Sequence, residues 1–350
     1  RAKIFCISDE YPYLCFSERN IRLKNMLTLD IIKCHGSANR FVMTDLTAHP
    51  DAAGADLAAL ARALCAHPAI TPCDGVLYVV RDANLYAMRM FNPDGSEAEM
   101  CGNGIRCVAR LVRERYVSTD DFLLRSGGRT YPIRRCPDID GAIPAFGVDM
   151  KIETRSRDFG FMPAGCSRFV AQPIPELDPE LAFTALSPGN PHIVACVGCI
   201  DMHRLEALGE AVKHLPGAFP HGINVSLYTR CAEQAIYAAT YERGAGITFS
   251  CGTAMTSCST AAVITGLCRP DADIEVYNRG GMVRCRCHID GDDITTRLSG
   301  NATYEWLGRA AWDGRTLTHV ECTARMEQEC ASYESFARRT AAKYPHATCL

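Results

Sequence analysis

Two cysteine–glycine pairs are the residues of this chain best suited to chemistry. Cys101-Gly102 precedes an apolar run with helical spacing, and Cys251-Gly252 precedes a second such run, 150 residues later. A thiol at a helix N-terminus lies at the positive end of the helix dipole, which favours the thiolate. The glycine lets the backbone approach a ligand closely, and the free amides of the first turn can hold a carboxylate.

Two such turns that face each other would place one sulfur on each side of a carbon that carries a carboxylate. One sulfur, as thiolate, would remove a proton while the other, as thiol, donates one to the opposite face. The helix ends would stabilise the charge that develops on the carboxylate in the transition state. A lone Cys-Gly at a helix start is usually structural, so the surrounding residues must decide between the two interpretations.

The elements that must position these turns alternate between strand and helix, which predicts a mixed α/β class. A strand–turn–strand unit is expected over 27–46, where apolar residues alternate on either side of a Gly-Ser-Ala-Asn turn. Further β-rich runs lie at 75–82, 85–92, 122–126, 131–135, 146–153, 192–198, 223–229 and 235–242. Helices are expected at 52–67, 105–113, 204–214 and 254–267.

Length and composition exclude several classes of protein. The chain has 350 residues, enough for about two domains, with 47% hydrophobic and 22% charged residues, as in ordinary globular proteins. A net charge of -3 provides no basic face for a nucleic acid. The first residues contain acids and prolines where a signal peptide needs an apolar stretch, and no apolar run reaches 18 residues. We therefore expect a cytoplasmic protein with no membrane partner.

Cysteine is the one anomaly of composition, with 20 in the chain. Disulfide frameworks belong to short secreted chains that cannot build a core, and this chain is long enough to build one. Its only CxxC pair is Cys196 with Cys199, and no second pair completes a zinc site. Cys285 and Cys287 are expected on one face of a strand. We expect no metal and mostly buried, reduced thiols; a thiol redox or zinc-binding protein remains an alternative.

The residues around both turns resemble the diaminopimelate epimerase family, whose members invert one α-carbon of a diamino diacid without a cofactor. The resemblance covers about residues 27–317 and rests on five motifs in the family's order. These are His35 to Asn39, Asn92 to Cys107, Gly189 to His192, Phe219 to Val225, and Tyr241 to Thr253.

The resemblance implies a fold of two pseudo-symmetric domains with the active site in the cleft between them. Each domain would be a mostly antiparallel sheet or barrel around a central apolar helix. The N-terminal domain, with Cys101, would span 27–143 and be completed by about 296–317. The C-terminal domain, with Cys251, would span 144–295, leaving 1–26 and 318–350 as extensions.

The resemblance also implies roles for individual residues. Cys101 and Cys251 would be the paired acid and base. The backbone amides that hold the carboxylate at the reacting carbon would belong to Gly102, Asn103, Gly252 and Thr253. The pocket for the far end of the substrate would be lined by Asn39, Asn92, Asn190, Asn224 and Arg243. Glu242 would bind an amino group, with His192 nearby. These types fit, because arginine pairs with a carboxylate in a bidentate manner and a carboxylate accepts from an ammonium.

The chain departs from the family pattern at four positions beside the proposed pocket. Arg40 stands where the family usually has an acidic residue, and Ile247 stands where it usually has glutamate. Ala254 and Met255 replace the usual Gly-Ala after the second Cys-Gly-Thr. No catalytic thiol is removed, so these changes bear on the identity of the substrate rather than on the type of reaction.

The leading hypothesis is an isomerase that converts LL-diaminopimelate to the meso form, for lysine and peptidoglycan precursors. The nearest rival is a racemase of the same fold acting on another amino acid, such as histidine. The polar set around Glu242 and Arg243 favours a substrate with a second amino-acid head group. A proline-racemase relative, a phenazine-type isomerase and a substrate-binding pseudoenzyme are disfavoured by the first motif and by the two cysteines. A small-molecule amino acid is the expected partner, and family members often form homodimers.

Overall fold

The computed structural model describes residues 26–163 and 165–349. The expected N-terminal extension, 1–26, therefore lies outside the described residues except for Met26. Nineteen of the strands in the described part of the chain join in one sheet, and two short strands pair separately. No helix in these ranges is long and apolar enough to cross a membrane.

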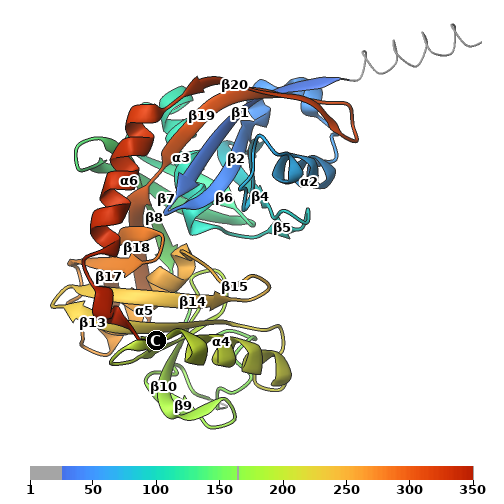
Figure 1. Cartoon of the computed structure of the whole chain (residues 1–350). Helices are drawn as coiled ribbons and strands as arrows, with labels where there is room; N and C mark the ends of the chain where they lie inside the picture. The colour runs from blue at the N-terminus through green and yellow to red at the C-terminus, as the bar shows by residue number, and fades with distance from the viewer. Residues whose placement is uncertain (1–25, 164, 350) are drawn as a thin grey trace, which may run out of the picture.

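The first half of the chain builds a sheet around one buried helix (Figure 1). Its strands are β1 (Leu27–Gly36), β2 (Asn39–Asp45), β3 (Gly75–Asp82), β4 (Leu85–Phe91), β5 (Glu97–Ala98), β6 (Asp121–Ser126), β7 (Arg129–Ile139) and β8 (Ile143–Lys151). Its helices are α2 (Leu57–Ala66) and α3 (Gly102–Arg115), and two short 3-10 turns precede α2 at Leu46–Ala48 and Pro50–Ala52. Helix α3 contacts β1, β2, β3, β4, β7 and β8 of this half, so it lies at the centre of the sheet.

The second half repeats this plan with its own strands and helices. Its strands are β9 (Gln172–Ile174), β10 (Asp178–Leu186), β11 (His192–Cys196), β12 (Ile200–Asp201), β13 (Asn224–Ala232), β14 (Ala235–Glu242), β15 (Gly246–Ile247), β16 (Asp273–Asn278), β17 (Gly281–Asp290) and β18 (Asp293–Asn301). Its helices are α4 (Met202–Ala211), followed by a 3-10 turn at Val212–His214, and α5 (Gly252–Ile264). Helix α5 contacts β10, β11, β13, β14, β16, β17 and β18.

Strand pairing confirms that the two halves are pseudo-symmetric. In the first half β2 pairs with β3 in parallel, β3 with β4 antiparallel, β4 with β6 in parallel, and β6–β7–β8 antiparallel. In the second half β11, β13, β14, β16, β17 and β18 pair with the same alternation. Strand β8 pairs with β18, which joins the halves into a mixed α/β fold that is mostly antiparallel, as predicted.

Both central helices share one hydrophobic core. Apolar residues of α3, such as Ile105 and Val108, belong to the same buried cluster as Met255 and Cys258 of α5. Separate clusters lie under α2 and under α4. The predicted domain boundary at 143/144 coincides with the first residue of β8, and the division of the chain at that point stays a prediction.

Local capping explains where the predicted helices begin. The helix expected at 52–67 begins at Leu57, because Pro50–Ala52 form a 3-10 turn and Asp56 caps the helix by accepting from the Ala59 amide at 2.9 Å. The helix expected at 204–214 begins at Met202, because Asp201 accepts from the next amides. Cys101 and Cys251 are the N-cap residues of α3 and α5.

The C-terminal segment, treated in the sequence only as an extension, is well structured. After β18, β19 (Thr303–Trp312) returns to pair with β1, and β20 (Leu317–Arg325) pairs with β19. Helix α6 (Glu327–Ala341) then runs along one side of the molecule past strands of both halves (Figure 1). A 3-10 turn at Pro345–Ala347 leads to β21 (Thr348–Cys349), which pairs with β12.

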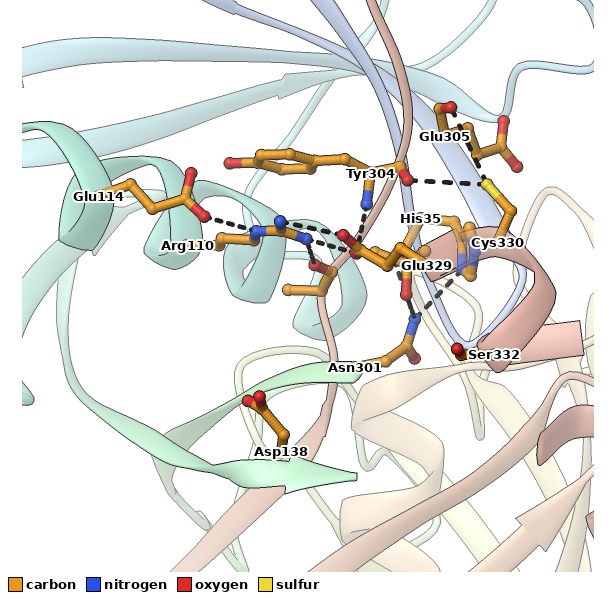
Figure 2. A network of polar contacts seen from close by, with 12 residues as sticks. His35, Arg110, Glu114, Asp138, Asn301, Tyr304, Glu305, Glu329, Cys330 and Ser332 are labelled. Carbon is orange, nitrogen blue, oxygen red and sulfur yellow. Dashed lines mark hydrogen bonds and ion pairs between the residues drawn. The ribbon is translucent and has the colours of Figure 1, made fainter. Parts of the chain in front are cut away.

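Polar contacts anchor α6 to the first half. Glu329 accepts from Arg110 of α3, with one Nη2–Oε2 distance of 3.1 Å, and from the Tyr304 amide at 2.9 Å. Arg110 also donates to Glu114 at 2.7 Å, so it lies between two carboxylates (Figure 2). Helix α6 thereby holds the side of α3 that faces away from Cys101.

Candidate active site

The first turns of α3 and α5 meet at their two glycines. A Cβ added to Gly102 would lie 3.3 Å from Gly252 Cα, and one added to Gly252 would lie 3.1 Å from Gly102 Cα. Both would also press on Leu298, at 3.1 and 3.0 Å. Only glycine allows the two backbones to approach so closely, and the result is that two helix N-termini, each capped by a cysteine, face one another.

Cys101 lies at the half-buried start of α3. The Gly104 amide donates to its Sγ at 3.4 Å, and its thiol lies 3.8 Å from Asn39 Oδ1. Burial raises the pKa of Cys101 to about 11, although the amides of Gly104 and Asn103 act to lower it. The helix end therefore favours the thiolate, as predicted, but does not overcome desolvation in the empty site.

Asn103 links the two cysteine turns directly. Its Nδ2 donates to Asn39 Oδ1 at 3.3 Å and to the carbonyl of Ser250, the residue before Cys251, at 3.2 Å. Asn39 follows the β1–β2 turn, and its own Nδ2 donates to Asp74 at 2.9 Å. One amide side chain from the first half thus reaches the chain that carries the second thiol.

Cys251 is buried beside a carboxylate. Burial, and then the charge of Glu242, raises the pKa of Cys251 well above its ordinary value. Thr253 Oγ1 lies 3.4 Å from Cys251 Sγ and acts to lower that pKa. Burial also raises the pKa of Glu242, and hydrogen bonds from Thr248 and Cys251 partly oppose the rise. Cys251 therefore lies next to a carboxylate, Glu242, whose negative charge opposes formation of the Cys251 thiolate.

His192 extends the contacts of the second thiol. Its Nε2 lies 3.0 Å from Thr253 Oγ1 and 3.1 Å from Asn190 Oδ1, with Asn224 Nδ2 at 3.4 Å. Burial, and then the charge of Arg243, lowers the pKa of His192 to about 3, so its ring is neutral at physiological pH. Its Nδ1 has no hydrogen-bond partner among the described residues. All the hydrogen-bond contacts of the ring are therefore made by Nε2, which lies within reach of Thr253, Asn190 and Asn224.

Asn224 and Arg243 lie at the edge of this group. The Arg243 amide donates to Asn224 Oδ1 at 2.9 Å, and the Arg243 guanidinium donates to the carbonyl of His221 at 2.7 Å. The side chain of Arg243 is exposed. Its charge is free to receive a carboxylate because, among the described residues, its guanidinium forms no ion pair.

Comparison with known proteins agrees with this geometry. A family model described as diaminopimelate epimerase matches residues 31–134 and 184–305. The chain is 34% identical over 331 residues to the diaminopimelate epimerase of Clostridium acetobutylicum, covering 92% of this chain and 98% of that protein. It is 33% identical over 322 residues to that of Listeria monocytogenes, covering 89% and 97%. The chain belongs to the diaminopimelate epimerase family. The predicted enzyme class, an epimerase-type isomerase, is confirmed.

Solved structures support the fold. A hydroxyproline epimerase from Agrobacterium vitis, with bound trans-4-hydroxy-L-proline, matches with a TM-score of 0.57 and 14% identity. The match covers 83% of this chain and 94% of that one. At this identity the likeness concerns the fold alone, and it agrees with the two pseudo-symmetric halves described above.

Asn92 differs from the other predicted pocket residues. Its Nδ2 donates to Ser96 Oγ at 2.9 Å, and its amide donates to the carbonyl of the same residue at 2.8 Å. Within the described part of the chain its contacts stay in its own turn, between β4 and β5. The structure therefore joins Asn39, Asn103, Asn190 and Asn224 to the thiols through hydrogen bonds, but not Asn92.

The four departures from the family pattern have structural partners. Arg40 pairs with Glu305 of β19 at 3.0 Å. Ile247 lies on β15 and packs against the hydrophobic core under α4. Ala254 and Met255 are buried in the first turn of α5. Three of the four thus serve the packing of the second half.

The surplus thiols form no metal centre among the described residues, where no group of three or more His, Cys, Asp or Glu side chains could hold an ion. Cys285 and Cys287 are both buried on one face of β17, as predicted. Cys196 is exposed. Cys65 and Cys73, which the sequence did not single out, lie with their sulfurs 3.1 Å apart.

Sequence reasoning also left three site residues without a role. Ser250 accepts from Asn103, and Asp74 accepts from Asn39. Arg106 is fully buried in α3, five residues after Cys101. Two signals in the sequence drew attention to Arg106: it belongs to the motif from Asn92 to Cys107, and it is a charged residue in the middle of an apolar run.

Proposed function

We propose that this protein converts LL-diaminopimelate to meso-diaminopimelate by proton transfer between Cys101 and Cys251. The observation that carries the proposal is the contact of Gly102 with Gly252, which brings together two helix N-termini that each have a cysteine as the N-cap residue. One sulfur removes the α-proton as thiolate, and the other donates a proton to the opposite face. The substrate leaves with one inverted α-carbon.

The helix ends supply the charge that this reaction needs. The free amides of Gly102, Asn103, Gly252 and Thr253 point their positive end at the substrate carboxylate, where negative charge develops in the transition state. Burial keeps both thiols protonated in the empty site. A thiolate therefore forms when the α-ammonium of the substrate adds a positive charge beside the sulfurs.

The far end of the substrate is a second amino-acid head group. Arg243 receives its carboxylate, aided by the amides of Asn190 and Asn224, and Glu242 accepts from its ammonium. Asn39 orients the first thiol. Asn92, which was predicted to line this pocket, holds its own turn through Ser96. A single-headed amino acid would leave Glu242 and Arg243 without a partner.

This function places the protein in the cytoplasm, where it supplies lysine and peptidoglycan precursors. Both curated relatives above carry the name diaminopimelate epimerase, which supports the substrate. Arg40, Ile247, Ala254 and Met255 are the positions at which a different substrate would be accommodated. A racemase for another amino acid is therefore the alternative that the test must separate.

The decisive experiment is proton NMR in D₂O with a reductant present. The enzyme is given LL-diaminopimelate, and in parallel L-histidine, L-lysine, L-glutamate and L-proline. We expect the α-proton signal of diaminopimelate alone to disappear while the meso product accumulates. Exchange in another amino acid would keep the two-thiol reaction and overturn the substrate. Absence of exchange in all five would overturn the proposed reaction.

A further inference from the structure

Arg106 is a buried cation without a buried anion. Its side chain is fully buried in α3, and no carboxylate among the described residues forms an ion pair with it. Its nitrogens donate to neutral oxygens instead: the Gly102 carbonyl at 2.9 Å, the Asn301 carbonyl at 3.2 Å, and Ser37 Oγ and Asn103 Oδ1 at 3.1 Å. Since a buried charge is costly without a partner, this arrangement needs an explanation.

The next arginine on the same helix shows how such a charge is usually neutralised. Arg110, one turn further along α3, lies between Glu114 and Glu329, and its pKa is raised (Figure 2). Burial instead lowers the pKa of Arg106. One face of α3 therefore holds a neutralised arginine, Arg110, and, one turn closer to Cys101, an uncompensated one, Arg106.

Two glycines make the space that Arg106 occupies. A Cβ added to Gly36 of β1 would lie 2.9 Å from Arg106 Nη2, and one added to Gly300 of β18 would lie 3.1 Å from the same atom. The guanidinium is therefore enclosed between two strands that meet in the core. Asn301, which accepts from Arg106, also donates to His35 (Figure 2).

Arg106 determines which way the Asn103 amide points. Arginine only donates hydrogen bonds, so the oxygen of Asn103 must face Arg106 and its Nδ2 must face away. That Nδ2 then reaches Asn39 Oδ1 and the Ser250 carbonyl. The contact between the two cysteine turns thus depends on a donor-only group behind Asn103.

The second turn has a neutral residue at the matching position. Thr256, five residues after Cys251, donates to the Gly252 carbonyl at 2.9 Å, as Arg106 does to the Gly102 carbonyl. The two side chains make the same backbone contact, but only one carries a charge. The two turns therefore have the same local backbone contact, and they differ in that only the first has a charged side chain behind it.

We propose that Arg106 is a positioning residue that holds the Asn103 amide across the two cysteine turns and places its uncompensated charge at the first turn of α3, on the Gly102 carbonyl, where it favours the Cys101 thiolate. The inference rests on the proposed two-thiol reaction. Charged and titratable groups around the pair also include Glu242 of β14, His35 of β1, Tyr333 of α6, and the thiols Cys107 and Cys285. Only Glu242 among them is a carboxylic acid. It lies next to Cys251, and it also acts to raise the pKa of Cys101, against the effect of Arg106.

The test is the rate at which iodoacetamide alkylates each thiol in the full-length protein, resolved by peptide mass spectrometry between pH 7 and 10. Only the thiolate reacts, so the rate reports ionisation and needs no substrate. In Arg106→Gln we expect the Cys101 rate at pH 8.5 to fall about tenfold, as a single buried charge shifts a pKa by about one unit. The Cys251 rate should stay within about twofold.

Two further variants separate charge from simple loosening of the helix. Arg106→Lys keeps the charge and should retain the Cys101 rate within about threefold of the wild type. Arg110→Gln removes the neutralised arginine one turn away and should leave that rate unchanged. An unchanged Cys101 rate in folded Arg106→Gln, or an equal fall in Arg110→Gln, overturns the proposal.

The effect of Arg106→Gln on kcat and KM tests whether Arg106 positions the Asn103 amide. On whichever amino acid the enzyme accepts, Arg106→Gln should lower kcat about tenfold or more and change KM less than threefold. If Arg106→Gln fails to fold, the wild-type rates decide: at each pH between 7 and 10 Cys101 must react faster than Cys251, and the reverse order overturns the proposal. Failure of the proposed substrate would leave the alkylation result intact.

Discussion

The two central helices, α3 and α5, begin in the same way, with an N-cap cysteine followed by glycine, but their buried polar side chains differ in kind. In α5 the buried hydroxyls of Thr256, Ser257 and Thr260 each donate to the carbonyl four residues back, at 2.8–2.9 Å. These hydroxyls of α5 are therefore satisfied by carbonyls of their own helix, and Thr253 and Thr260 also bond side chains of other elements, His192 and Thr296. In α3 the polar groups are Arg106 and Arg110, and both reach other elements.

This difference shows that a symmetric backbone does not give the two thiols the same tendency to ionise. Each half pairs its strands in the same order, and each helix begins at a capping cysteine. Yet Cys101 lies above a buried cation, whereas Cys251 lies beside Glu242. An enzyme that inverts a carbon in both directions needs one acid and one base at any moment, and this inequality favours Cys101 as the thiol that first becomes the base.

The largest expected effect comes from removing either thiol. Cys101→Ala and Cys251→Ala should each lower the inversion rate by about a thousandfold or more, because one proton transfer loses its donor or acceptor. The measurement is the appearance of inverted product by proton NMR, with circular dichroism as a control for folding. Near wild-type turnover by either variant would show that two bases are not required.

Oxidation should join the two halves and stop turnover reversibly. The sulfurs must reach one carbon from opposite faces, so we expect them to come close enough to cross-link when no substrate is bound. We expect mild oxidation to abolish activity, a reductant to restore it, and peptide mapping to identify a Cys101–Cys251 disulfide. Cys65→Ser is the control, because the sulfurs of Cys65 and Cys73 lie 3.1 Å apart and this pair could also be oxidised. This variant should lose activity on oxidation just as the wild type does. Full activity in protein shown to contain the Cys101–Cys251 bridge would contradict this prediction.

Removing the carboxylate of Glu242 should reduce the difference in pKa between Cys251 and Cys101. In Glu242→Gln the pKa of Cys251 should fall, because the charge that raises it is gone. We expect alkylation of Cys251 at pH 8.5 to accelerate about fivefold or more, and KM for diaminopimelate to rise about tenfold as the ammonium loses its acceptor. A slower Cys251 reaction in this variant would reverse the assigned sign.

Each half also buries one neutral histidine, and both should destabilise the protein in acid. Burial lowers the pKa of His35 and of His192 to about 3, from an ordinary value of 6.5. Between these values the unfolded chain binds more protons than the folded one, so stability falls as the pH drops below about 6.5. Each histidine contributes a slope of about 1.4 kcal/mol per pH unit.

Urea unfolding between pH 7 and 4.5 measures this slope. His192→Gln should remove about half of the contribution that the two histidines make together, because glutamine does not titrate. The Asp and Glu side chains common to both proteins cancel in the comparison. An identical pH dependence of the unfolding free energy in the two proteins would contradict the neutral, buried state of His192.

The smallest effect is expected at the neutral counterpart of Arg106. Thr256→Val removes the hydrogen bond to the Gly252 carbonyl, which costs about 1 kcal/mol or less because that carbonyl also accepts within the helix. The Cys251 alkylation profile should not change. A shift as large as that expected for Arg106→Gln would show that the backbone contact, and not the charge, controls thiol ionisation.

Local sequence determined the elements and the reactive residues. Alternating apolar residues predicted the β1–β2 hairpin, and cysteine before glycine marked the starts of α3 and α5. These features depend on neighbours in the chain, so periodicity and capping suffice to find them. The family motifs pointed to the same two turns.

The C-terminal segment shows where this kind of reasoning ends. Strand β20 is largely exposed, and α6 buries only Tyr333 and Phe336, so neither element has a strong apolar period. Their stability comes from pairing with β19 and from the contact of Glu329 with Arg110. A helix whose anchoring residue, Arg110, lies 219 residues before Glu329 in the chain gives little local signal.

Only the tertiary structure decided how the site is assembled and charged. The approach of Gly102 to Gly252, the reach of Asn103 to Ser250, and the enclosure of Arg106 between Gly36 and Gly300 all join segments far apart in sequence. Residue types predicted that two thiols could act on one carbon. Burial and neighbouring charge, which no local pattern encodes, set the ionisation of each thiol, because desolvation and Coulomb energies depend on distances in space.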